Sequence, residues 1–151
     1  MPRRRDPLTL DLFAWTPPPV TRRFEAVQVR AAGLRGSLAR AVATSLKECG
    51  RTREDVARDM TAYLGEDVPK TMLDAYASQA REDHTISALR LVALIHATRD
   101  IRLLNLIADL FGWAVVPQKY LPAIEEAVLA DKIEELSRRK TRARQNWKAG
   151  Q

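Results

Sequence analysis

Apolar residues recur with helical spacing in a series of short segments, and this pattern constrains the fold of the chain more than any other feature. Along 34–48 and 52–64 they lie three, four or seven residues apart, which is typical of helices with one buried face. Gly50 and Gly65 follow these segments, and glycine often ends a helix because it adopts the left-handed conformation without strain. Further segments of this kind are 68–81, 87–98, 101–111 and one from Pro122 to about residue 147. We therefore expect an all-α protein, a compact bundle of about five to six helices with flexible basic tails.

Polar residues and a proline mark several of the helix starts. Thr52 is followed three residues later by Asp55, an arrangement much like a capping box. Ser87 stands where an N-cap of the fourth helix would, and Pro69 suits a first helical position because its missing N–H would be unpaired there anyway. The run WAVVP at 113–117 is expected to be an extended connector or a minor strand, and one such run cannot make a sheet.

The apolar positions of these helices predict the core. They are Val27, Leu34, Leu38, Val42 and Leu46 in the first helix, Val56, Ala57, Met60, Tyr63 and Leu64 in the second, and Met72, Leu73, Tyr76 and Ala80 in the third. The fourth helix is apolar over more than half its circumference, which predicts packing on two sides. In the last helix one side carries Leu121, Ile124, Val128, Ile133 and Leu136. We expect this first half to pack and the second half to project, with self-association of the apolar stripe as the alternative to closure over the chain's own core.

Composition excludes several classes of function. The chain has a single cysteine, Cys49, so an intrachain disulfide and a thiol-rich zinc site are both excluded. No segment approaches the ~20 apolar residues of a membrane span, and no secretion signal precedes the first helix. Glycines stand singly, so no phosphate-binding loop is present. We expect a soluble, cytoplasmic protein that is not an enzyme and holds no metal or cofactor.

The two histidines do not change that expectation. His84 follows Glu82 and Asp83, but consecutive side chains point in different directions, which favours a polar loop over a metal or acid–base site. His96 lies on an apolar helix and is interpreted as a core or boundary side chain.

Positive charge is concentrated in the tails. The net charge is +6, yet residues 31–136 carry 13 basic and 16 acidic side chains. Residues 1–30 carry +3, and 137–151 carry +6 without any acid. Such tails are typical of nucleic-acid binding, because Lys and Arg that neutralise phosphates release counterions; the alternative is that they only solubilise the ends. We expect phosphate contacts from Arg138, Arg139, Lys140, Arg142, Arg144 and Lys148. Trp147 within this run could stack on a base or pack on a partner.

The sequence predicts three parts: an arm at 1–26, a helical domain at 27–136 and a basic tail at 137–151. The triple proline of TPPPV at 16–20 favours extended backbone in the arm. The arm also carries apolar residues that could lie across the domain or across a protein partner, namely Leu8, Leu10, Leu12, Phe13 and Trp15.

The segment 52–80 predicts an αα-hairpin with a polar outer face on its second helix. A helix-turn-helix that reads DNA needs one helix crossing another closely, with the second free to enter the major groove. Ala57 provides a small side chain for such a crossing. The candidate DNA-reading residues are Lys70, Thr71, Asp74, Ser78, Gln79 and Arg81. A purely structural hairpin is the alternative.

The sequence EDVARDM, a glycine turn and VPKTMLDAY resemble the helix-turn-helix of phage repressors and regulators. The stretch 52–117 resembles small regulatory proteins of temperate phages and Mu-like prophages, and much of that likeness lies in LRLVALIHATRDIRLLNLIADLFGWAVVP. One departure is the spacing from Ala57 to Gly65, which is eight residues where repressor-type motifs usually have four. The resemblance implies a phage- or prophage-derived regulator of transcription that binds double-stranded DNA, with a homodimer as one possible state. The alternative is a protein–protein adaptor of a phage programme that uses the arm and the last helix.

Overall fold

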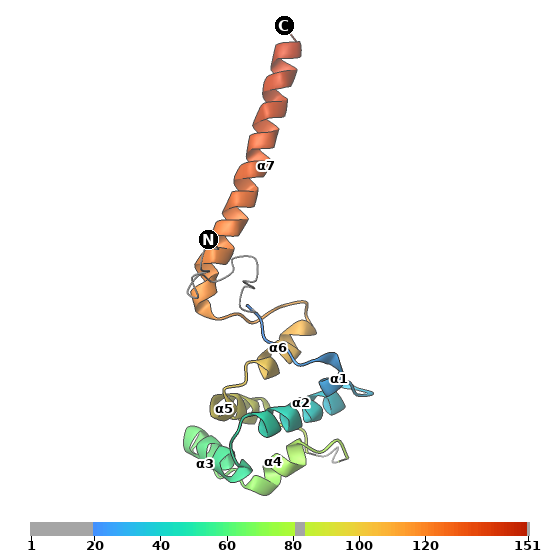
Figure 1. Ribbon diagram of the computed structural model, residues 1–151, viewed down its shortest axis with the longest axis vertical. Helices are drawn as coiled ribbons and strands as arrows, with labels where there is room; N and C mark the ends of the chain where they lie inside the picture. Colours follow the sequence, from blue (N-terminus) through green and yellow to red (C-terminus); the bar gives the residue numbers. More distant parts are fainter. Residues whose placement is uncertain (1–19, 81–83, 151) are drawn as a thin grey trace, which may run out of the picture.

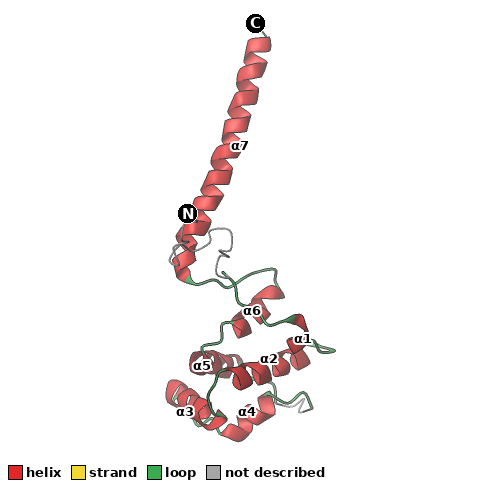
Figure 2. Ribbon diagram, viewed as in Figure 1, coloured by secondary structure: helices red, strands yellow, loops and turns green. Residues whose placement is uncertain are grey.

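The computed structural model describes residues 20–80 and 84–150, and within these ranges the secondary structure is helical throughout, without a strand. The helices are α1 (Ala26–Val29), α2 (Leu34–Glu48), α3 (Arg53–Leu64), α4 (Lys70–Tyr76), α5 (Ala88–Thr98), α6 (Arg102–Asp109), the short 3-10 helix η1 (Gln118–Tyr120) and α7 (Leu121–Ala149). Helices α1 to α6 gather at one end of the molecule, and α7 projects from them (Figure 1; Figure 2). The prediction of an all-α protein is confirmed.

Most local signals at the helix ends act as the sequence predicts, but Pro69 is the extended N-cap of α4 and not its first helical residue. The backbone N–H of Asp55 donates to the Thr52 hydroxyl at 3.1 Å, and that hydroxyl donates to the Asp55 carboxylate at 2.7 Å. Ser87 accepts a hydrogen bond from the backbone N–H of Arg90. Gly65 ends α3 in the left-handed conformation, with φ of 72°. These caps satisfy backbone groups that a helix end would otherwise leave unpaired.

The core lies between α2, α3, α4 and α5 and extends to α6. Its fully buried side chains include Val42, Val56, Met60, Leu73, Leu94 and Leu103. Helix α3 packs along α5, while α2 contacts α1, α4 and α6. Val68 is also buried, and its backbone N–H donates to the Thr61 hydroxyl at 2.9 Å. The segment between α3 and α4 therefore folds back along α3 and does not extend away from it.

Several predicted positions differ from the structure. Helix α4 ends at Tyr76 and not at residue 81, because buried Tyr76 and buried Ile86 hold the two ends of the following loop against the core. Val27 and Leu34 are exposed, since they precede the part of α2 that faces the bundle. Helix α5 buries only one side, with Leu89 and Val92 exposed, so the prediction that it packs on two sides is wrong.

Buried Asn105 of α6 joins three segments of the chain. Its side-chain N–H groups donate to the backbone carbonyls of Arg22 at 2.9 Å and Val115 at 3.3 Å, and its side-chain oxygen accepts from the Val115 N–H at 2.7 Å. Residues 113–117 are thereby held as the extended connector that the sequence allows. The connector leads the chain away from the bundle and into α7.

Helix α7 has no buried residue. The prediction that its first half packs on the domain is wrong, because the connector ends where no face of the bundle stands opposite the apolar stripe. The helix continues without a break across residue 136 and through the basic residues to Ala149. The basic tail, which we expected to be flexible, is helical as far as residue 149.

We predict that Asn105→Asp lowers the free energy of unfolding by about 2–4 kcal/mol, because a buried carboxylate cannot donate to two carbonyls and brings an unpaired charge. Urea unfolding followed by circular dichroism measures the change. Asn146→Asp makes the same chemical change at an exposed position of α7 and should cost no more than about 0.5 kcal/mol. Equal effects at the two positions would contradict the role of Asn105.

Candidate nucleic-acid interface

Helix α4 presents only half of the residues predicted to read DNA. Lys70, Thr71 and Asp74 lie on its exposed side. Ser78 and Gln79 follow the C-terminal end of the helix, so they do not share its face. Arg81 lies outside the described residues. The predicted reading surface is thus reduced to about two turns of helix.

Two of these three residues are engaged with the start of α3. The Lys70 ammonium lies 2.6 Å from the Glu54 carboxylate, and Arg53 forms an ion pair with Asp74. The hydrogen bond between Glu54 and Lys70 lowers the pKa of Glu54 and raises the pKa of Lys70. Both pairs are exposed, so they stabilise the fold only weakly. Their main consequence is that a phosphate would have to compete with Glu54 for Lys70.

The neighbouring surface of α3 has mixed charge. Arg51 pairs with Asp59 at 2.6 Å and also donates to the backbone carbonyl of Ala97 at 3.1 Å, which ties α3 to the end of α5. Arg58 pairs with Asp55 on the same helix. Most cations of the hairpin thus already have an acidic partner, which was not foreseen from the sequence because Arg53 and Asp74 are far apart in it.

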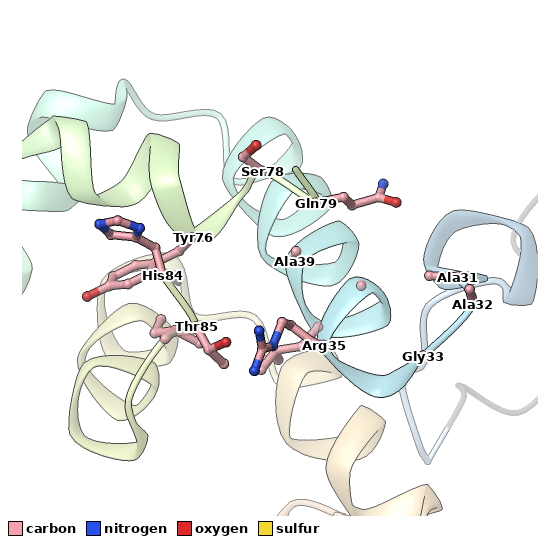
Figure 3. A pocket seen from close by; sticks show the side chains of 13 residues that line it. Ala31, Ala32, Gly33, Arg35, Ala39, Tyr76, Ser78, Gln79, His84 and Thr85 are labelled. Atoms are coloured by element: carbon pink, nitrogen blue, oxygen red, sulfur yellow. The ribbon is translucent and has the colours of Figure 1, made fainter. Parts of the chain in front are cut away.

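Ser78 and Gln79 line a hollow of about 280 Å³ between the start of α2 and the loop before α5. Figure 3 shows Ala39 on the α2 side and Tyr76, His84 and Thr85 on the other. The position of the hollow at the end of α4 separates Ser78 and Gln79 from the exposed face that carries Thr71.

A second charged cluster lies between α2 and α6. Arg102 contacts Asp100 and Glu48, each at 2.7 Å, and its guanidinium stacks 4.3 Å from the centre of the Phe24 ring. Burial acts to raise the pKa of Asp100, but hydrogen bonds from Arg102 outweigh it and hold that pKa below its ordinary value. The charged groups satisfy one another, so this cluster holds the two helices together.

The histidines form no metal site in the described part of the chain, where no three His, Cys, Asp or Glu side chains gather in a metal-binding arrangement. His96 is half-buried and stacks on Tyr63 with 4.3 Å between ring centres, which confirms its position at the boundary of the core, although its buried Nδ1 has no hydrogen-bond partner among the described residues. His84 is exposed in the loop before α5.

The second half of α7 is the most positive surface among the described residues. Arg138 and Arg139 each lie 2.5 Å from a glutamate one turn earlier, Glu134 and Glu135. The four cations beyond them are exposed and form no ion pair within the described ranges; they are Lys140, Arg142, Arg144 and Lys148. Trp147 is exposed among them. Two of the six predicted phosphate contacts are therefore partly neutralised, and four are fully available.

Comparison with known proteins finds no match to any family model, any curated protein or any solved structure. In the described segments, no helix combines the length and the apolar character needed to cross a membrane.

We predict that the Glu54 carboxyl titrates below its ordinary pKa, because the Lys70 ammonium stabilises its charged form. Carbon-detected NMR of the glutamate side chains across an acid titration measures this pKa. In Lys70→Gln the pKa of Glu54 should rise toward that of a free glutamate. Lys47→Gln removes an exposed lysine from α2 and should leave it unchanged. A Glu54 pKa that does not respond to Lys70→Gln would show that the pair does not form in solution.

Proposed function

We propose that this protein binds double-stranded DNA and regulates transcription, with the exposed basic half of α7 supplying most of the affinity. The observation that carries the proposal is a set of four cations that form no ion pair with any described residue and lie on a helix that projects from the bundle. Cations that are free to neutralise phosphates gain affinity for any DNA through counterion release. The resemblance of 52–117 to regulators of temperate phages and Mu-like prophages supports a regulatory role.

Sequence preference would come from α4. Thr71 is exposed, and Lys70 can reach a base edge if it leaves Glu54. Asp74 would stay with Arg53 or accept from a cytosine amino group. The turn between α3 and α4 folds back along α3, so the two helices have a fixed relation in which α4 faces outward. In this proposal α7 binds the phosphate backbone and α4 contacts the bases that determine sequence preference.

A protein–protein adaptor is the second candidate, and the apolar side chains left exposed on α7 favour it. An adaptor would bind its partner through the arm at 1–26 and the stripe from Leu121 to Leu136. Binding of this kind depends on apolar area and should survive high salt, whereas DNA binding should weaken steeply as salt increases.

We predict that replacing Lys140, Arg142, Arg144 and Lys148 by glutamine weakens binding to every duplex. The slope of log K against log salt should become shallower by about 3.6 if all four cations contact phosphates, since each phosphate contact contributes roughly 0.9. Fluorescence anisotropy with a random duplex at several salt concentrations measures both quantities.

The matched control removes the same number of charges from outside α7, by replacing Arg22, Arg30, Lys47 and Lys119 by glutamine. These four residues are exposed and form no ion pair within the described ranges. Its slope should stay close to that of the parent protein. Equal slopes for the two variants would mean that net charge, and not the position of α7, determines binding. Absence of binding at low salt would refute the DNA proposal and favour the adaptor.

For Lys70→Ala combined with Thr71→Ala, we predict a larger loss of specific than of nonspecific binding, because base-edge contacts carry the sequence information. The specific loss should be about 1–3 kcal/mol. It is measured by comparing a preferred duplex from the neighbourhood of the gene with a random duplex. The same loss on both duplexes would exclude α4 as the reading helix.

A further inference from the structure

Helix α7 leaves six large apolar side chains in solvent along its first half: Leu121, Ile124, Val128, Leu129, Ile133 and Leu136. Each of them is at least 44% exposed. They share one broad side of the helix, since successive members lie one, three or four residues apart. A side this apolar is normally covered by another surface.

The spacing of these residues is the same when read from either end, and their identities match except at the centre, where Val128 corresponds to Leu129. Leu121 and Leu136 are the outermost pair, Ile124 and Ile133 come next, and Val128 and Leu129 are in the centre. When two copies of the helix run antiparallel about a two-fold axis between 128 and 129, each of these residues faces its counterpart. Self-complementarity of this kind is what an interface with two-fold symmetry requires.

Charged residues follow the same symmetry and determine the direction of pairing. Glu125 and Lys132 are equally distant from the axis and lie on the same side of the helix as the apolar residues, so antiparallel copies would place each glutamate opposite the lysine of the other copy. Lys132 has Glu135 as its partner within one chain, at 2.6 Å. Parallel copies would place Glu125 opposite Glu125 and the basic residues 138–148 side by side, which like-charge repulsion disfavours.

We infer that α7 is a self-association surface, and that two copies of this chain pair antiparallel over residues 121–136. The basic segments beyond residue 137 then leave the paired region at opposite ends. This inference rests on the apolar and charged pattern of the first half of α7 and does not depend on DNA binding.

Disulfide trapping tests the direction of pairing. In the full chain with Cys49→Ser, three variants are made: Leu121→Cys alone, Leu136→Cys alone, and the two substitutions together. In antiparallel pairs positions 121 and 136 meet, while two copies of position 121 are roughly 22 Å apart along the helix. Mild oxidation should therefore give a covalent dimer with Leu121→Cys/Leu136→Cys and little with either single substitution. Covalent dimers from the single substitutions would indicate parallel pairing and would overturn the inference. Absence of a covalent dimer in all three variants would also overturn it.

Sedimentation equilibrium of the full chain without DNA tests the charge pairing. Glu125→Lys or Lys132→Glu alone should weaken dimerisation on the order of tenfold, because like charges then meet across the axis. Combining the two changes exchanges the charges and should restore dimerisation. Glu126→Lys makes the same change on a neighbouring side of the helix and should have a much smaller effect. The inference fails if the parent chain is a monomer, because another segment or another protein would then cover the stripe. It also fails if the combined change does not recover dimerisation.

Discussion

The hydrogen bonds of buried Asn105 decide where the bundle ends and where α7 begins. One amide side chain satisfies backbone groups of Arg22 and Val115, so it fixes both the approach to α1 and the connector after α6. A buried polar group of this kind is favourable only when all of its bonds are made, and this allows a single arrangement of the three segments. The connector that Asn105 holds at Val115 leads the chain from α6 away from the core to the start of α7. The apolar stripe and the basic residues are both exposed for this reason.

The same chain uses its charges in two different ways. In the bundle, several cations are paired with acids from other segments, as in Lys70 with Glu54 and Arg102 with Glu48. Such pairs set the relative position of helices at little gain in stability when they are exposed. Along the end of α7 the cations have no acids beside them, so their charge remains available to a partner. A surface becomes an attractive site for phosphate by lacking acidic neighbours as much as by having lysine and arginine.

Predictions from the sequence were correct for features that depend on residues close together in the chain. The boundaries of α2 and α3 and the caps at Thr52 and Ser87 depend on residues within one helical turn, and the structure confirms them. The length of α4, the exposure of Leu89 and the pairing of Arg53 with Asp74 depend on which elements meet in space, so periodicity does not reveal them. The role of Asn105 was missed for the same reason, although an asparagine within the apolar run from Leu103 to Ile107 was a usable signal. For the candidate interface, the sequence predicted the basic residues of α7 but not which of them are neutralised.

An isolated helix of this composition needs a source of stability beyond its own sequence. The ion pairs that join Glu134 to Arg138 and Glu135 to Arg139 have the favourable orientation, with the acid one turn before the base, but each contributes only about 0.2–0.5 kcal/mol. Most helices in proteins are held by packing of an apolar face, and α7 has no such packing within the described chain. Pairing of two copies would supply it to the first half alone, because the second half is polar. The paired, apolar half of the helix would then be rigid, and the basic half would extend from it. The length of the paired region, and not the position of the bundles, would set the distance between the two basic segments.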